Sequence, residues 1–279
     1  MSFEFFPPKS EAGVEQLRRA VADLEPLRPD FVSVTYGANG SGRERTMEAT
    51  RLISTQTVVT TMGHLTCVGQ TADELRGVLA TYANMGVRHI LAVRGDPEGG
   101  PTAEWHTHPG GLANATELVR LIKKEGDFCV GVGAFPDTHP EHHDAALDAR
   151  ILLGKQEAGA EFAITQLFFR AQAYFGLVER VRAIGCTLPI IAGIMPVTNV
   201  SQIERFATLS GAELPGDIVR RLRRVEDDPA AVREVGLEVA VELCEELLEG
   251  GAPGLHFCTQ NRSRATVEIV DTLRKSGKL

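Results

Sequence analysis

Short apolar runs alternate with longer amphipathic stretches along almost the whole chain. The runs are rich in β-branched and aromatic residues, which predicts buried strands, and the stretches carry apolar residues at helical spacing. The predicted strands are Ser2–Phe6, Phe31–Tyr36, Val58–Cys67, His89–Arg94, Phe128–Phe135, Phe162–Phe168, Pro189–Met195 and Gly254–Thr259. The predicted helices include Glu11–Leu24, Ala72–Met85, Ala113–Lys124, Ala145–Ala158 and Ala231–Leu248.

Strand–helix alternation favours parallel strands joined by crossover helices. The chain has 279 residues, and a (β/α)8 barrel typically needs roughly 250. We therefore predict an α/β fold, a single (β/α)8 TIM barrel over residues 1–279. The segment Gly211–Pro229 predicts an extra short helix before the last strand, and the Pro- and Gly-rich segment Asp96–Gly111 predicts a long loop at the rim.

A doubly wound open sheet shows the same alternation and is the competing fold. Its dinucleotide-binding form would carry a G-x-G-x-x-G turn after the first strand. The turn here, Phe6–Ser10, contains no glycine. That difference favours the barrel over the open sheet.

Composition narrows the class of protein. Hydrophobic residues make up 43% of the chain and charged residues 24%, with a net charge of −8, which argues against nucleic-acid binding because phosphate contacts need a basic face. No apolar run has transmembrane length, and the N-terminus does not resemble a signal peptide. The five cysteines lack C-x-x-C spacing, so we expect reduced thiols in a cytoplasmic protein. Oligomeric state stays open, with a homo-oligomer among the options.

The first strand carries one carboxylate, Glu4, among Phe3, Phe5 and Phe6. Desolvation among aromatic rings would disfavour the charged form and raise the pKa of this carboxyl. A raised pKa suits a general acid near neutral pH. The alternative is an ordinary solvated glutamate on an edge strand.

Polar residues also end several other predicted strands, and in a barrel such positions are the first candidates for chemistry. They are Thr35, Tyr36, His64, Arg94, Asp96 and Gln166. Arg94 and Asp96 are costly to bury unless paired or bound to a ligand, so a structural ion pair is the alternative there. Gln166 is expected to be a buried amide that needs partners for its donor and acceptor.

Histidines in two loop segments raise the question of a metal. His139 and His142, with three-residue spacing, and the pair His106 and His108 would suit zinc if other ligands lay nearby. Pro140 and the lack of further clear ligands favour solvated loop histidines. We therefore predict no metal site.

Taken together, these segments resemble the bacterial methylenetetrahydrofolate reductases, and they cover nearly the whole chain in the order of that family. The matching blocks are SFEFFPP at 2–8, VSVTYGA at 32–38, HLTC at 64–67, RGD at 94–96, HPE at 139–141, AITQ at 163–166, GIMPVTN at 193–199 and Asn261-Arg262.

The resemblance implies a barrel that reduces 5,10-methylenetetrahydrofolate to 5-methyltetrahydrofolate, with FAD passing a hydride from NADH or NADPH. By position, Glu4 matches the general acid, and Asp96 and Gln166 match further catalytic residues. Gln166, Gln202, Phe206 and Arg262 match folate contacts. The flavin-site positions are Thr35, Tyr36, Ala38, His64, Arg94, Gly95, Asp96, Ala115, Phe135, His139, Asp148 and Lys155.

The flavin positions depart from the family pattern more than the folate positions do. Phe135 stands where the family has a tyrosine, and Ile151 and Gly154 stand where asparagine and a basic residue are common. Losing two charge-assisted hydrogen bonds, each worth roughly 1.5–3 kcal/mol, would weaken FAD binding by on the order of 10²- to 10⁴-fold. Two alternatives follow: a diverged reductase with weak or no FAD binding that takes the hydride directly from NADH, and a non-catalytic folate-binding protein.

Overall fold

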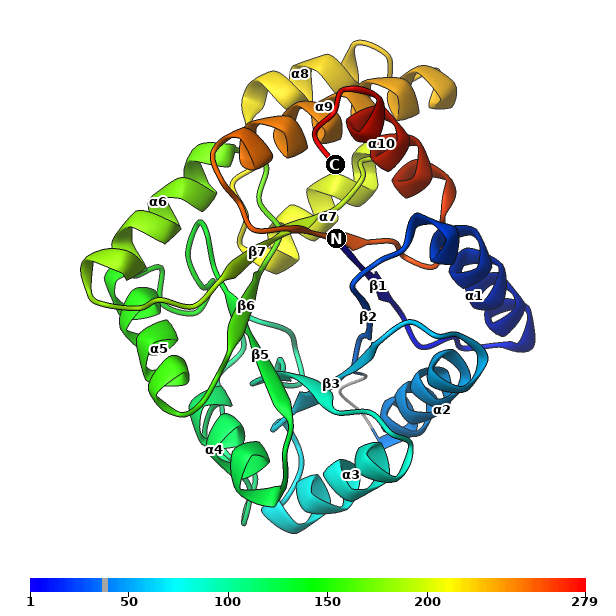
Figure 1. Ribbon diagram of the computed structural model, residues 1–279. Helices are drawn as coiled ribbons and strands as arrows, with labels where there is room; N and C mark the ends of the chain where they lie inside the picture. Colours follow the sequence, from blue (N-terminus) through cyan, green and yellow to red (C-terminus); the bar gives the residue numbers. More distant parts are fainter. Residues whose placement is uncertain (37–39) are drawn as a thin grey trace.

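Eight parallel strands close into a barrel in chain order, β1 to β8 (Figure 1). The computed structural model describes residues 1–36 and 40–279, with the side chains at 40, 41, 202 and 209 outside the description. The strands are β1 (Ser2–Phe5), β2 (Phe31–Val34), β3 (Thr61–Thr66), β4 (His89–Val93), β5 (Cys129–Ala134), β6 (Phe162–Thr165), β7 (Ile190–Ile194) and β8 (Leu255–Cys258). β8 pairs with β1, so the predicted (β/α)8 barrel is confirmed and the open sheet is wrong.

Helices surround the barrel on the outside (Figure 1). They are α1 (Glu11–Leu24), α2 (Gly40–Gln56), α3 (Ala72–Asn84), α4 (Ala115–Glu125), α5 (Ala145–Glu157), α6 (Ala171–Ala183), α7 (Val200–Ser210), α8 (Gly216–Arg223), α9 (Pro229–Glu249) and α10 (Arg264–Lys275), with a 3-10 turn η1 (Glu25–Leu27) after α1. The predicted extra helix before the last strand is α8. Within the described residues, no helix combines the length and apolarity needed to cross a membrane.

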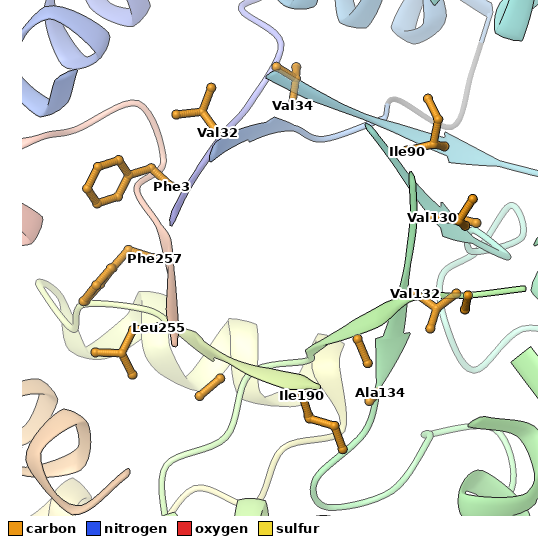
Figure 2. Packing of buried hydrophobic residues seen from close by; sticks show 14 of the residues in the cluster. Phe3, Val32, Val34, Ile90, Val130, Val132, Ala134, Ile190, Leu255 and Phe257 are labelled. Carbon is orange, nitrogen blue, oxygen red and sulfur yellow. The ribbon is translucent and has the colours of Figure 1, made fainter. Parts of the chain in front are cut away.

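Alternation along the strands sorts side chains between two layers. Figure 2 shows Phe3, Val32, Val130 and Phe257 pointing away from the barrel interior, where the helices cover them. Successive side chains on a strand point to opposite faces. Glu4, between Phe3 and Phe5, therefore points into the barrel.

The barrel interior changes character from bottom to top. Met62, Leu91 and Ile164 form a buried apolar cluster inside it, against which Phe31 and Phe162 pack. Gly131 makes this possible, because a Cβ there would lie 2.5 Å from the Phe162 ring. Nearer the carboxyl ends of the strands, the inward positions carry the polar side chains of Glu4, His64 and Thr66, which is the end where TIM barrels place their chemistry.

Candidate active site

Glu4 lies at the centre of a polar group at the barrel mouth. The Thr35 hydroxyl donates to the Glu4 carboxylate, and His256 Nε2 on β8 lies 3.5 Å from Glu4 Oε2. His256 Nδ1 is in turn 2.7 Å from the Ser2 hydroxyl. With its proton on Nε2, His256 would accept from Ser2 and donate to Glu4, which is the tautomer that satisfies both contacts.

The expected rise in the pKa of Glu4 is wrong for the protein without ligand. Burial raises this pKa, but the His256 contact, the charges of His64 and His256 and the Thr35 hydrogen bond together outweigh it and lower the pKa to about 2. The flanking phenylalanines that suggested an apolar setting point away from the carboxylate, which instead has polar neighbours. Glu4 is therefore ionised at neutral pH before substrate binds.

Two side chains of β3 face the same interior with unused polar atoms. His64 Nε2 and Thr66 Oγ1 are buried and have no hydrogen-bond partner among the described residues. Desolvation lowers the pKa of His64 to about 4, so its ring is neutral at pH 7. Buried polar atoms without partners are rare, and a polar ligand or water would satisfy them. We call Glu4, Thr35, His64, Thr66 and His256 the mouth cluster.

A second polar group lies at the rim beyond β4 and β5. Arg94 forms an ion pair with Glu141, and its guanidinium carbon lies over the Trp105 ring at 4.7 Å from the centroid. The structural ion pair considered for Arg94 is thus present, but its partner is Glu141 rather than Asp96. Trp105 belongs to the loop 96–111 and packs on the main core.

The rest of this group is linked through Asp148 on α5. Asp148 is buried, accepts from the backbone N–H of His139 at 2.9 Å, and lies 3.5 Å from His142 Nε2. Burial raises the pKa of Asp148. The His139 ring stacks on His142 and meets Phe135 edge-on at 4.7 Å, and desolvation, with the charge of Arg94, lowers its pKa to about 4.

Lys155 is buried on the same helix and donates to the Gly133 carbonyl at 2.8 Å. Burial lowers the pKa of this amine to about 8, although Asp148 acts in the opposite direction. Its ammonium is thus aimed at the sheet. We use the name rim cluster for Arg94, Trp105, Phe135, His139, Glu141, His142, Asp148 and Lys155.

The other predicted catalytic residues lie on exposed parts of the mouth. Asp96 is exposed beyond β4, although partial desolvation still raises its pKa against the charge of Arg94. Gln166 follows β6 and is exposed, with its Oε1 accepting from Leu167 N at 2.9 Å. The expectation of a buried amide at Gln166 is wrong, because β6 ends at Thr165 and Gln166 lies just beyond it at an exposed position.

Gly95 separates Arg94 from Asp96 and could not be replaced without strain. Its φ is +83°, and a Cβ would lie 2.6 Å from Val68 Cγ1. Its left-handed backbone therefore fixes the turn between the strand end and the rim loop.

Three more flavin-site predictions fall near β2 and α4. Tyr36 is buried and donates to Gln70 Oε1 at 3.1 Å, and Ala115 is buried in the first turn of α4. Neither contacts the rim cluster through a hydrogen bond or ion pair within the described residues. Ala38 lies outside the described residues.

The predicted folate contacts come from α7 and the end of β8. Phe206 is half-buried on α7, Gln202 lies on the same helix with its side chain outside the description, and Arg262 is exposed. Asn261 holds this end of the barrel, because its side chain accepts from Phe6 N and donates to Phe6 O, both at 2.9 Å. Arg262 thus follows a segment anchored to the strand that carries Glu4.

Sequence reasoning missed His256, Ser2 and Thr66 at the mouth, and Glu141 as the partner of Arg94. A signal existed for Thr66, because it is two residues beyond His64 and therefore shares its face. Ser2 stands in the same relation to Glu4. His256 carried no such signal, since its closeness to Glu4 depends on barrel closure.

Whether the rim residues fit a flavin dinucleotide depends on the pyrophosphate, which needs cations or N–H groups. The two rim cations, Arg94 and Lys155, are bound to Glu141 and to the Gly133 carbonyl. Gly154 on α5 offers only open space, and Ile151 nearby is an exposed apolar side chain. In this arrangement the rim cluster does not fit the pyrophosphate of FAD.

The protein is a closed parallel barrel. It has an inward carboxylate and unsatisfied polar atoms at the carboxyl ends of its strands, and these features define it as a TIM-barrel enzyme with a candidate site at the mouth. Comparison with known proteins makes this specific: the family model described as methylenetetrahydrofolate reductase matches residues 1–274. The chain belongs to the methylenetetrahydrofolate reductase family.

Relatives support the assignment over nearly the whole length. The 5,10-methylenetetrahydrofolate reductase of Escherichia coli (strain K12) is 37% identical over 274 residues, covering 98% of this chain and 90% of that protein. The enzyme of the same name from Pectobacterium carotovorum is 36% identical, covering 98% and 89%. Methylenetetrahydrofolate reductase 1 of Schizosaccharomyces pombe is 36% identical, covering 98% of this chain and 45% of its own length.

Solved structures share the fold at low identity. A Clostridium thermocellum protein described as binding two copies of 5-methyl-5,6,7,8-tetrahydrofolic acid is 15% identical, with a TM-score of 0.66 over 99% of this chain and 94% of its own. Dihydropteroate synthase from Stenotrophomonas maltophilia is 13% identical, with a TM-score of 0.53 over 99% and 92%. At these identities the likeness concerns the fold alone.

Proposed function

We propose that this protein reduces 5,10-methylenetetrahydrofolate to 5-methyltetrahydrofolate at the barrel mouth, with NADH or NADPH as the source of the hydride. Family membership supports the substrate. The observation that carries the mechanism is the inward carboxylate of Glu4, held by Thr35 and His256 at the barrel mouth.

The substrate carries a one-carbon bridge between two nitrogens, and one of those C–N bonds must break before a hydride can be added. The leaving nitrogen needs a proton, and Glu4 is placed to give it as a general acid. Because Glu4 is ionised in the free site, it must first take up a proton. A bound pterin ring would exclude water from the mouth and raise the pKa of Glu4 through further desolvation.

The remaining mouth residues suit recognition of the pterin and stabilisation of its cation. His64 and Thr66 offer buried polar atoms in need of partners, and a pterin edge carries both donors and acceptors. The carboxylate of Asp96 would stabilise the positive charge that develops on the opened substrate. We also assign Gln166, Gln202, Phe206 and Arg262 to folate binding.

The flavin route stays the competing proposal for how the hydride arrives. In it, Thr35, Tyr36, Ala38, His64, Arg94, Gly95, Asp96, Ala115, Phe135, His139, Asp148 and Lys155 would hold FAD, which supplies hydride transfer chemistry when bound. The observation that favours it is the family itself, and the engagement of the rim cations Arg94 and Lys155 within the chain counts against it.

The test is direct. Purified protein is mixed with methylenetetrahydrofolate and either NADH or NADPH, and 5-methyltetrahydrofolate is measured by chromatography with mass detection. We expect product with at least one nucleotide. Folate binding in a titration, with no product from either nucleotide with or without added FAD, would make the chain a folate-binding protein and overturn the proposal.

A further inference from the structure

We propose that this chain transfers the hydride directly from the reduced nicotinamide ring to the folate in the barrel mouth, with no resident flavin. The inference rests on the proposed function and specifies its reductant. It is carried by the rim cluster, where the two cations that would hold a dinucleotide already have partners within the chain.

The first step concerns Arg94, whose guanidinium is enclosed on two sides. Glu141 pairs with Nη1 and Trp105 covers its face, while Nη2 is buried without a partner among the described residues. The Arg94 side chain is 19% exposed and that of Glu141 is 35% exposed, so the guanidinium is partly shielded from solvent and a phosphate would have to displace the Glu141 carboxylate from it. Breaking such a pair leaves a poorly solvated charge, which is costly.

The second step concerns α5, which would line the pyrophosphate. Lys155 donates into the sheet at Gly133, and Asp148 accepts from the His139 backbone. Arg150 is exposed and lies two residues from Asp148, close to the opposite side of the helix. The described face of α5 that carries Asp148 and Lys155 therefore offers a pyrophosphate no accessible cation.

The third step is the balance of charge. In the rim cluster, the carboxylates of Glu141 and Asp148 match the two cations Arg94 and Lys155 in number. His139 is neutral at pH 7 because its pKa is lowered to about 4. A pyrophosphate would therefore add negative charge to a region with no surplus of positive charge to balance it.

The same rim does not exclude a nicotinamide nucleotide, because a co-substrate needs much weaker binding than a resident cofactor. Co-substrates commonly bind with constants of roughly 1 μM to 1 mM, whereas a flavin that stays with the protein must bind far more tightly. A nicotinamide ring can stack in the mouth beside the pterin while its pyrophosphate stays hydrated. The unsatisfied atoms of His64 and Thr66 are available to its carboxamide or to the pterin.

The chemistry balances without another redox partner. Glu4 gives its proton to the leaving nitrogen as the bridging C–N bond breaks, which leaves a methylene iminium on the other nitrogen. The dihydronicotinamide C4 then gives a hydride to the methylene carbon, and the C=N π pair returns to nitrogen. The products are the methyl-folate and the oxidised nicotinamide, and Glu4 recovers its proton from solvent.

The experiment uses the full-length protein as purified and NADH or NADPH carrying deuterium at both C4 positions. Direct transfer places one deuterium in the methyl group of the product, and initial velocities with both substrates varied give intersecting lines. Transfer through a flavin passes the hydrogen through an N–H group that exchanges with solvent, and the velocity lines are parallel. Absorbance in the flavin bands is recorded on the same sample.

Retained deuterium with intersecting lines in protein without flavin absorbance is the expected result. Methyl-folate that lacks deuterium, formed with parallel lines by a yellow protein, would overturn direct transfer and leave the proposed function standing. Absence of methyl-folate with both nucleotides, with or without added FAD, would remove the proposed function and this inference with it.

Discussion

The mouth cluster and the rim cluster are both polar groups at the carboxyl ends of the strands, yet they differ in how their atoms are satisfied. At the mouth, His64 and Thr66 carry buried polar atoms without partners among the described residues. At the rim, the charged groups of Arg94, Asp148 and Lys155 each have a partner within the chain, although Arg94 Nη2 and Trp105 Nε1 are buried without one. Buried polar atoms without partners cost free energy, so both clusters offer atoms to a polar ligand, but at the rim the cations that a pyrophosphate would need are already engaged within the chain.

The largest effect that separates the two clusters is expected at Glu4. Glu4→Gln keeps the shape but cannot give a proton, so methyl-folate formation should fall by about 10²- to 10⁴-fold. The rate is measured under saturating substrate, and folate affinity is measured separately by titration. Glu15→Gln, the same change at an exposed position of α1, serves as the control and should keep full activity. A Glu4→Gln rate close to wild type would show that another group supplies the proton.

At the rim, a large effect is expected in stability rather than activity. Lys155 has a pKa of about 8 in the folded protein against 10.5 when unfolded. Between these values the unfolded state binds more protons, so the free energy of unfolding should rise with pH, by up to about 3 kcal/mol. In Lys155→Met this rise should disappear.

Urea unfolding from pH 7.5 to 9.5 on wild type and variant measures the difference between their slopes. Lys275→Met, at the exposed end of α10, is the matched control and should follow the wild-type slope. If Lys155→Met also follows the wild-type slope, the Lys155 amine is solvated in solution and not buried as in this structure.

A smaller effect tests whether lack of a cation limits flavin binding. Gly154 faces open space, so Gly154→Arg can place a guanidinium beside a pyrophosphate without a clash. One charge-assisted hydrogen bond contributes about 1.5–3 kcal/mol, which corresponds to roughly 10- to 100-fold tighter FAD binding. FAD titration followed by absorbance measures it, with Gly154→Ala as the control expected to bind like wild type. Equal affinity in all three proteins would mean that α5 does not face the pyrophosphate.

These contrasts also show what the sequence alone could predict. Period-two alternation fixed that Glu4 faces opposite to Phe3 and Phe5, and the eight strand–helix repeats predicted the closed barrel that Figure 1 shows. Strand ends were predicted a few residues too long, as at Val58, which is 97% exposed while β3 begins at Thr61. The local sequence pattern identifies the type of an element and its buried face more readily than the residue where the element ends, because the ends depend on neighbouring loops.

Partners distant in sequence were beyond local reasoning. The pKa of Glu4 depends on His256 from the other end of the chain, brought beside it only when β8 pairs with β1. The Arg94–Glu141 pair likewise joins residues 47 positions apart. The type of residue could be predicted at these places, but its electrostatic environment could not, since that is set by the closure of the barrel.

The smallest expected effect tests the central contrast at a single hydroxyl. Thr66→Val removes an oxygen that has no partner in the described free protein, so the free energy of unfolding should stay equal or rise. If the hydroxyl binds substrate, KM should increase by about 2- to 10-fold, since one hydrogen bond contributes about 0.5–1.5 kcal/mol. Thr50→Val is the comparison, because Thr50 is buried with its hydroxyl donating to the Thr46 carbonyl at 2.7 Å. That variant should lose stability and keep its KM. A Thr66→Val protein that is destabilised with unchanged KM would show that the oxygen already has a partner in the free protein, and the difference between mouth and rim would no longer hold at this position.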